Sequence, residues 1–240
     1  MKIYSIASGS SGNLYVIKSG VDIILIEAGI PPTEMNTELW DRGLRLSDID
    51  DCFITHEHMD HFHSAEYLIK HRTNIYLPRT EAIEDSLKNV TQQDRVIYLE
   101  DKQTITVGNF KATALKLEHD GVDILGYLIL HKPSDKRLFY ATDTAYIKYN
   151  PKRVNYFMIE VNYQRKYLEE SVREGDMSRE NMRRVMRSHM GLNAALKFFE
   201  STDLSQAEEI WIIHTSGRNA NRLEVKDIIQ SETGIPTFIG

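Results

Sequence analysis

The sequence has one cysteine, Cys52, among its 240 residues, so no disulfide can form within the chain. It has no apolar run long enough for a membrane-spanning helix, and its first residues lack the apolar segment and cleavage site of a secretory signal. These absences exclude an integral membrane protein and disfavour an exported, disulfide-stapled domain. We therefore expect a cytoplasmic protein without a membrane partner.

Positive charge is also scarce, since 29 Lys and Arg residues face 35 Asp and Glu residues, a net charge of −6. This excludes a protein that coats nucleic acid by bulk charge, although a local basic groove remains compatible with it. The 13 glycines and 6 prolines form no linker, and no repeat or low-complexity segment is visible. Because 41% of the residues are hydrophobic, we expect a single domain over 1–240.

Short apolar runs separated by turn residues predict strands, with helical patterns interleaved and more frequent in the second half. Strands are expected at 2–7, 14–17, 21–26, 52–54, 74–77, 95–99, 104–107, 110–117, 123–131, 137–141, 156–161 and, as the last core strand, 209–213. Helices are expected at 33–40, 64–71, 80–88, 164–172, 178–188, 192–199 and 219–230. This order predicts an α/β fold in which two sheets pack face to face with helices outside.

Three histidines and two carboxylates are concentrated in His56-Glu57-His58-Met59-Asp60-His61, directly after an apolar strand. Imidazole nitrogen and carboxylate oxygen are ligands for borderline divalent cations, and both Zn and Mn suit such a set. The alternative is a solvated histidine-rich loop, which the density of ligands disfavours. The spacing predicts a metal site and allows for a second ion nearby.

Three further residues of ligand type each follow a strand-like run: His119, Asp143 and His214. Taken singly, each residue is better explained by a structural or solvent-facing position than by a role as a metal ligand. Because loops at strand ends gather at one edge of a sheet, we expect the three to complete a site for two ions.

These seven residues, in this order, resemble the metallo-β-lactamase superfamily of hydrolases, whose members fold as a four-layer αββα sandwich of two packed mixed β-sheets. The resemblance implies two divalent ions, Zn or Mn. It implies that one ion is bound by His56, His58 and His119, that the other is bound by Asp60, His61 and His214, and that Asp143 bridges both.

Other motifs resemble one branch of the superfamily, the YycJ-like (WalJ-type) nucleases near ribonuclease Z. The matching segments are the turn Ser8 to Asn13, His119-Asp120 with Gly126-Tyr127, Ala141 to Thr144, Glu160 to Tyr163, and His214 to Asn219. A departure is Glu27, because the family usually has Asp after its third strand. A β-lactamase proper is disfavoured, since the set lacks a cysteine ligand and Cys52 is expected in the core.

The seven expected ligands suggest chemical roles for individual residues. We expect a hydroxide held between two ions to attack phosphorus, with Asp60 as ligand and as the group that orients the nucleophile. His189 is the candidate proton donor to the leaving oxygen, and the resemblance supports it. The alternative for His189 is a surface histidine at a helix end.

Several residues are candidates for substrate binding. Arg179, Arg183 and Arg187 recur at helical spacing on one face, which predicts either a phosphate-binding stripe or a solvated face. The amides around Ser10 could hold a phosphate, and a tight turn explains that loop equally well. The expected substrate-binding set is Ser10, Asn162, Arg183, Arg187, Ser216 and Asn219.

The sequence therefore predicts a di-metal phosphodiesterase or nuclease that acts on nucleic acid, first of all on DNA. The alternative is hydrolysis of cyclic mononucleotides, as phage-encoded relatives of this fold perform against immune signals, and a more distant one is a lactonase, thioesterase or glyoxalase-like activity. A metal-stabilised binding protein without turnover is disfavoured, because all seven ligand positions are filled. We expect a homodimer, the commonest oligomer.

Overall fold

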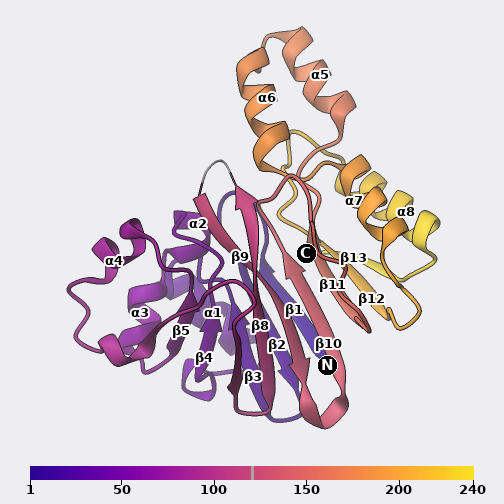
Figure 1. The fold of residues 1–240 in the computed structure, drawn as a ribbon. Coiled ribbons are helices and arrows are strands. Elements are labelled where there is room, and N and C mark those ends of the chain that lie inside the picture. Colours follow the sequence, from indigo (N-terminus) through magenta and orange to yellow (C-terminus); the bar gives the residue numbers. More distant parts are fainter. Residues whose placement is uncertain (120–121) are drawn as a thin grey trace.

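Two β-sheets pack face to face in the computed structural model, which describes residues 1–119 and 122–240 (Figure 1). Asp120, part of the His-Asp motif, lies outside the described residues. Helices cover the outer face of each sheet, so the expected αββα sandwich is confirmed.

The first sheet is built from the first six strands of the chain, in sequence order. The three N-terminal strands form an antiparallel meander, and the remaining strands add in parallel. The strands are β1 (Lys2–Ala7), β2 (Leu14–Ser19), β3 (Asp22–Ile26), β4 (Asp51–Phe53), β5 (Asn74–Leu77) and β6 (Val96–Tyr98).

The second sheet has the order β13-β12-β11-β10-β9-β8-β7, with antiparallel pairing from β7 to β10 and parallel pairing from β10 to β13. Its strands are β7 (Thr104–Val107), β8 (Phe110–His119), β9 (Val122–His131), β10 (Lys136–Ala141), β11 (Tyr156–Glu160), β12 (Glu209–Ile213) and β13 (Thr237–Ile239). The expectation that 209–213 is the last strand is wrong, because β13 adds beside it. β13 directly follows Pro236, and the segment Gly234-Ile235-Pro236 indicates a turn and not a strand.

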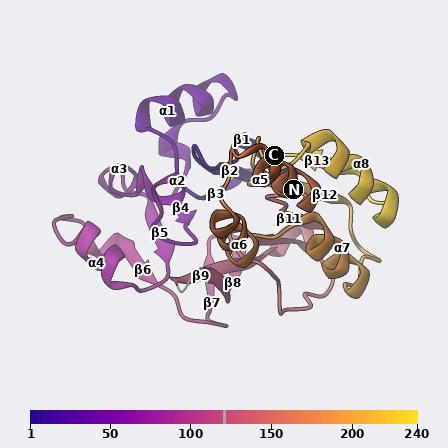
Figure 2. The ribbon, with the colours of Figure 1, turned by 90° about the horizontal axis from the view of Figure 1, so that it is seen from above.

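Eight α-helices and three 3₁₀ turns occur in the described ranges 1–119 and 122–240. They are α1 (Pro32–Asp41), η1 (Leu46–Asp48), α2 (Met59–Phe62), α3 (Ala65–Lys70), α4 (Glu81–Leu87), η2 (Gln93–Arg95), η3 (Lys132–Ser134), α5 (Arg165–Glu174), α6 (Arg179–Ser188), α7 (Leu192–Ser201) and α8 (Arg222–Thr233). Seen from above, α1, α3 and α4 lie on one side of the molecule and α7 and α8 on the other (Figure 2). No described helix is long and apolar enough to cross a membrane.

Three apolar cores hold these layers together. Between the sheets lie fully buried aromatic side chains such as Tyr15, Phe53 and Tyr127. Outside the first sheet, Cys52 is buried among aliphatic residues, which confirms its expected place in the core. The phenylalanine pair Phe198 and Phe199 of α7 packs on the second sheet.

The strand directions determine at which edge of the two sheets the site lies. Because β1 and β3 both pair antiparallel with β2, they run parallel to β4 and end at the same edge. In the other sheet, β8, β10, β11 and β12 share one direction for the same reason. Ligands in mixed and parallel sheets bind at such carboxyl edges. The helical pair α5 and α6 projects beyond this edge (Figure 1).

At the opposite end of the sandwich, a buried histidine joins three hairpins. His131, 3% exposed, contacts Asp22 Oδ2 through Nε2 at 3.1 Å and Ser19 Oγ through Nδ1 at 3.0 Å. The Asn109 side chain also donates to Asp22, at 2.9 Å to Oδ2. The hydrogen bonds from Asn109 and His131 hold the pKa of Asp22 below its usual range.

We predict that Asp22→Ala lowers the free energy of unfolding by about 1–2 kcal/mol at pH 7, the loss of hydrogen bonds to a charged group. Because the folded pKa is depressed, this contribution is present above the unfolded pKa of about 4 and is lost as the pH falls through the folded value. Urea unfolding from pH 7 to pH 3 measures it. Asp85→Ala, which removes an exposed helix ion pair, is the control. A difference that grows on acidification contradicts the prediction.

Candidate metal centre

The metal loop connects β4 to α3 and lies at the carboxyl edge of the first sheet. His56 follows the strand within three residues, and the four-residue helix α2 carries Asp60 and His61 on one short turn. This turn is held against two other loops by backbone bonds. Asn13 N donates to Asp60 O at 2.8 Å, and Ala28 N donates to His61 O at 2.8 Å. The loop conformation therefore depends on residues in the loops that follow β1 and β3.

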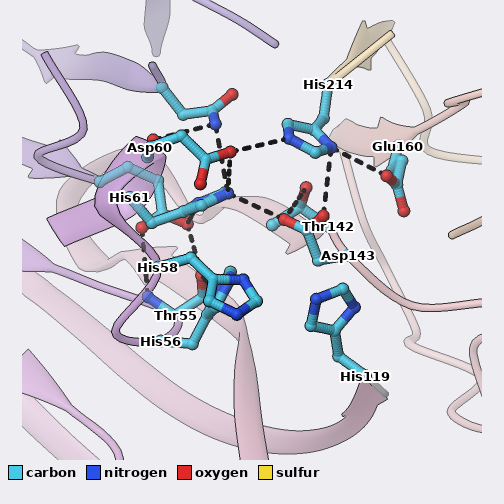
Figure 3. A network of polar contacts seen from close by, with 12 residues as sticks. Thr55, His56, His58, Asp60, His61, His119, Thr142, Asp143, Glu160 and His214 are labelled. Atoms are coloured by element: carbon cyan, nitrogen blue, oxygen red, sulfur yellow. Dashed lines mark hydrogen bonds and ion pairs between the residues drawn. The ribbon is translucent and has the colours of Figure 1, made fainter. Parts of the chain in front are cut away.

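The first ligand cluster contains His56, His58 and His119, whose candidate ligand atoms all lie within 4.8 Å of one another. His56 and His58 come from the metal loop, with Nε2 of the first 2.9 Å from Nδ1 of the second. His119 ends β8 and approaches from the opposite sheet (Figure 3).

The second cluster contains Asp60, His61 and His214, with the same limit of 4.8 Å between candidate atoms. His214 directly follows β12, and its Nε2 lies 3.2 Å from Asp60 Oδ2. Asp143 lies between the clusters. Its Oδ2 is 2.9 Å from His61 Nε2, and its Oδ1 is 3.2 Å from His214 Nδ1. The structure thus brings all seven expected ligands together (Figure 3).

The tautomers of the histidines fit metal ions. Thr55 Oγ1 donates to Glu27 at 2.8 Å, so His56 Nδ1 must donate to Thr55 Oγ1, also at 2.8 Å, and Nε2 keeps its lone pair. His119 Nδ1 donates to the Ser188 carbonyl at 3.0 Å, with the same consequence. Such outer partners on Nδ1 are typical of metal-bound imidazoles.

The electrostatics of the first cluster also fit a cation. Burial lowers the pKa of His56 well below its usual value, and burial together with His119 lowers the pKa of His58. Both rings are therefore neutral at pH 7, as ligands must be. Although burial raises the pKa of Asp143, the neighbouring His214 and His61 hold it well below the usual range, so its carboxylate is charged. The donor set suits two divalent ions of the Zn or Mn type.

Glu27 braces the metal loop from behind, in the place where the family usually has Asp. It is fully buried, and its Oε1 accepts from Thr55 Oγ1 and, at 3.0 Å, from the Tyr140 hydroxyl. Nδ1 of His61 lies 3.1 Å from the same oxygen. Burial lowers the pKa of His61, but Glu27 and Asp143 outweigh it and raise the pKa well above its usual value.

Glu160 is a second buried carboxylate, which the sequence placed in a motif without a role. At the end of β11 and 0% exposed, it accepts from His214 Nδ1 at 2.9 Å and from His189 Nδ1 at 2.7 Å. The backbone amides of Thr144 and Met190 donate to its other oxygen, both at 3.2 Å. The sequence feature that could have indicated this role is the position of a charged residue at the end of an apolar strand.

His189 lies beside the second cluster and lines the cavity that opens over both clusters. Its Nδ1 is 2.7 Å from Glu160 Oε1 and 3.1 Å from Asp143 Oδ1. Burial lowers its pKa, but Glu160 and Asp143 outweigh this and raise it to about 10. Both carboxylates therefore favour the protonated form of the His189 ring, which lies next to the expected ligands.

Three site residues have left-handed backbone conformations that side chains with a Cβ seldom adopt: Glu27 at φ 65°, Asp143 at φ 49° and His214 at φ 50°. Each follows the end of a strand, β3, β10 or β12, where the chain must turn at once. Such strain persists where the surroundings impose it, and it is concentrated at functional sites.

A cavity of about 330 Å³ opens over the clusters. Its lining contains Ser10, as expected, and His189. From α6, the described lining residues are Arg184, Val185 and Ser188, so the helix turns Arg184 to the cavity and not the expected Arg183 and Arg187.

The other expected substrate-binding residues lie elsewhere. Asn162 is 6% exposed, and its Nδ2 donates to the His214 carbonyl at 3.1 Å, so it supports that ligand from behind. The Ser216 amide donates to the Asn162 carbonyl at 3.1 Å. Asn219 lines a separate cavity of about 570 Å³ beside α5.

Comparison with known proteins agrees with this geometry. The family model described as "Beta-lactamase superfamily domain" matches residues 23–215. The exodeoxyribonuclease WalJ of Streptococcus pneumoniae serotype 2 (strain D39 / NCTC 7466) is 26% identical over 249 residues, covering 97% of this chain and 90% of that protein.

Solved structures show the same fold. The metallo-beta-lactamase fold protein YhfI from Bacillus subtilis superposes with a TM-score of 0.72 at 16% identity, covering 99% of this chain and 95% of that one. Human tRNase Z, short form, superposes with a TM-score of 0.64 at 14% identity, covering 100% of this chain and 96% of that one.

Close packing against Gly29 leads to a prediction about the metal loop. A Cβ at Gly29 would overlap the backbone carbonyl of Asp60, so Gly29→Ala must displace that part of the loop. We predict that the variant folds but binds fewer than two ions, and that hydrolysis falls about 100-fold, as for a misplacement of about 1 Å. Elemental analysis after gel filtration measures the ions. Gly217→Ala is the control, because its Cβ meets no atom within 4 Å. Full metal content in Gly29→Ala contradicts the prediction.

Proposed function

The chain belongs to the Beta-lactamase superfamily and is a metal-dependent hydrolase of the nuclease or phosphodiesterase type, and from this premise we propose that it is a di-metal nuclease that cleaves DNA. The observation that carries the proposal is the convergence of the seven ligand residues beneath a cavity whose lining includes His189. The name of the relative WalJ, an exodeoxyribonuclease, supports DNA ends as the substrate.

The metal roles proposed here are those implied by the family resemblance. His56, His58 and His119 would hold one ion, Asp60, His61 and His214 would hold the other, and Asp143 would be shared by both. When bound, two such ions lower the pKa of water and neutralise the charge on a phosphate. Zn and Mn are both candidates for this His/Asp set. We also propose a cytoplasmic homodimer, for the reasons given from the sequence.

The chain's own groups then divide the work of the reaction. Asp60, partly open to the cavity with 23% of its side chain exposed, accepts a hydrogen bond from the attacking water and orients it. His189 donates a proton to the leaving oxygen. Glu160, hydrogen-bonded to both His189 and His214, holds the donor and a ligand in fixed relation.

A second candidate, hydrolysis of cyclic mononucleotides, is favoured by the size of the cavity. About 330 Å³ is near the lower end of the roughly 300–1,000 Å³ range of small-molecule sites. Such a cavity encloses one nucleotide, whether it is free or the end of a strand.

Turnover of the metal-loaded protein on a panel of substrates separates these candidates. The panel contains single-stranded DNA, double-stranded DNA, RNA and the 3′,5′-cyclic mononucleotides, with Asp60→Ala measured beside the wild type. We expect DNA to be degraded, and Asp60→Ala to lose at least about 100-fold in rate, because it removes a ligand and the orienting group. Opening of cyclic mononucleotides alone would establish the second candidate. Inactivity on every substrate would contradict phosphodiester hydrolysis.

The proton-donor role of His189 predicts a dependence on the leaving group. We expect His189→Ala to slow cleavage of a DNA strand by about 10²–10⁴-fold, the range for general acid catalysis. The rate of cleavage of bis(p-nitrophenyl) phosphate should fall far less in this variant, because p-nitrophenolate leaves without a proton. His71→Ala is the control, since His71 lies at the exposed end of α3. Equal losses on both substrates would contradict the role.

A further inference from the structure

The helix α6 forms one wall of the cavity over the metal clusters. Its C-terminal end is fixed there, because the Ser188 carbonyl accepts from His119 Nδ1 at 3.0 Å and His189 contacts Glu160. From this end the helix rises away from the sheets and continues into the projecting hairpin with α5 (Figure 1). A substrate strand that leaves the cavity on this side therefore runs beside α6.

Arg184 lies one turn before Ser188 on the same face, roughly 6 Å further along the helix axis. Both residues line the cavity, together with Val185 between them. His119 and His214 line the same cavity. Arg184 thus lies at the mouth of the cavity, about one helical turn from the clusters that would hold the reacting phosphate.

The guanidinium of Arg184 is available for a ligand. Its side chain is exposed, and within 1–119 and 122–240 no carboxylate forms an ion pair with it. Arginines on α5 differ, since Arg165 is paired with Glu169 and Arg173 with Glu170. An unpaired guanidinium beside a phosphodiester site suits a phosphate, which it can bind through two hydrogen bonds.

We propose that Arg184 binds the phosphate next to the scissile one, an assignment that rests on the proposed function. The reacting phosphate itself belongs between the ligand clusters, where the cations supply the charge, so an arginine one turn away reaches the neighbouring phosphate. The site then selects substrates with at least two phosphates in a chain, and an isolated diester or a cyclic mononucleotide leaves Arg184 without a partner.

The test compares two substrates and two adjacent arginines. Thymidine dinucleotide has one phosphodiester, whereas the trinucleotide has two, so its cleavage leaves a flanking phosphate whichever end reacts. Wild type, Arg184→Ala and Arg183→Ala are assayed as metal-loaded proteins, with kcat and KM measured separately and metal content recorded. Arg183→Ala is matched, because it removes the same charge from the next residue of α6, outside the described lining of the cavity.

We expect wild type to favour the trinucleotide in kcat/KM by about ten-fold, as hydrogen bonds to a charged group contribute. Arg184→Ala should lose this preference through a higher KM for the trinucleotide, and its rate on the dinucleotide should stay within about two-fold of wild type. The slope of log(kcat/KM) for the trinucleotide against log salt concentration should become shallower by about 1. Arg183→Ala should keep the preference.

The opposite results separate the inference from the proposed function. The flanking-phosphate assignment is overturned if Arg184→Ala lowers kcat/KM equally on both substrates, or if Arg183→Ala has the same effect as Arg184→Ala. In either case the enzyme remains a phosphodiesterase. A wild type that cleaves both substrates without preference also overturns it. Inactivity of the wild type on dinucleotide, trinucleotide and bis(p-nitrophenyl) phosphate overturns the proposed function and the inference with it.

Discussion

Four carboxylates lie at one edge of an apolar sandwich, and the balance of their charge governs the rest of the site. Glu27, Asp143 and Glu160 are almost fully buried, and Asp60 is mostly so. A buried carboxylate costs several kcal/mol unless a positive charge and hydrogen bonds compensate it. Histidine protons or divalent ions can supply that charge, and the raised pKa of His214, to about 9, follows from Asp143, Asp60 and Glu160 outweighing its burial.

Glu27 and Glu160 play parallel parts in this balance, one for each sheet. Glu27 sets the hydrogen bonds of Thr55 and, through it, the tautomer of His56. Glu160 sets the orientation of His214 and His189. Because outer carboxylates fix ring orientation and raise ligand basicity, the two glutamates extend the centre beyond its ligands. They also tie the site to β3 and β11, which are interior strands of the two sheets.

The α6 helix joins the metal centre to the proposed path of a substrate strand. Its last carbonyl orients His119, the next residue along the chain contacts Glu160, and the turn above presents Arg184. Helix α6 and its C-cap residue therefore carry the carbonyl that contacts His119, the proposed proton donor His189 and the proposed phosphate-binding Arg184. A site held on helices and strands keeps its geometry better than one held on loops alone.

Local pattern was enough to predict most of the fold and the ligand set. The strands from β1 to β12 were predicted from their apolar runs, and His119, Asp143 and His214 each lie at or just after the end of one, so their order and type were informative. Helix α2 and strand β13 were not predicted. Helix α2 is a single turn inside the ligand-rich loop, and β13 directly follows Pro236, a residue typical of turns.

By itself the sequence was enough to predict the candidate ligands, because metal chemistry restricts the choice to a few side-chain types at strand ends. Only the tertiary structure decided which arginine faces the cavity and what Glu160 holds. Helical spacing sorts Arg183, Arg184 and Arg187 into faces, but the rotation of α6 about its axis is set by packing against distant residues. The partners of a buried carboxylate are likewise far apart in sequence, as Glu160 and His214 are, and only the folded sheets bring them together.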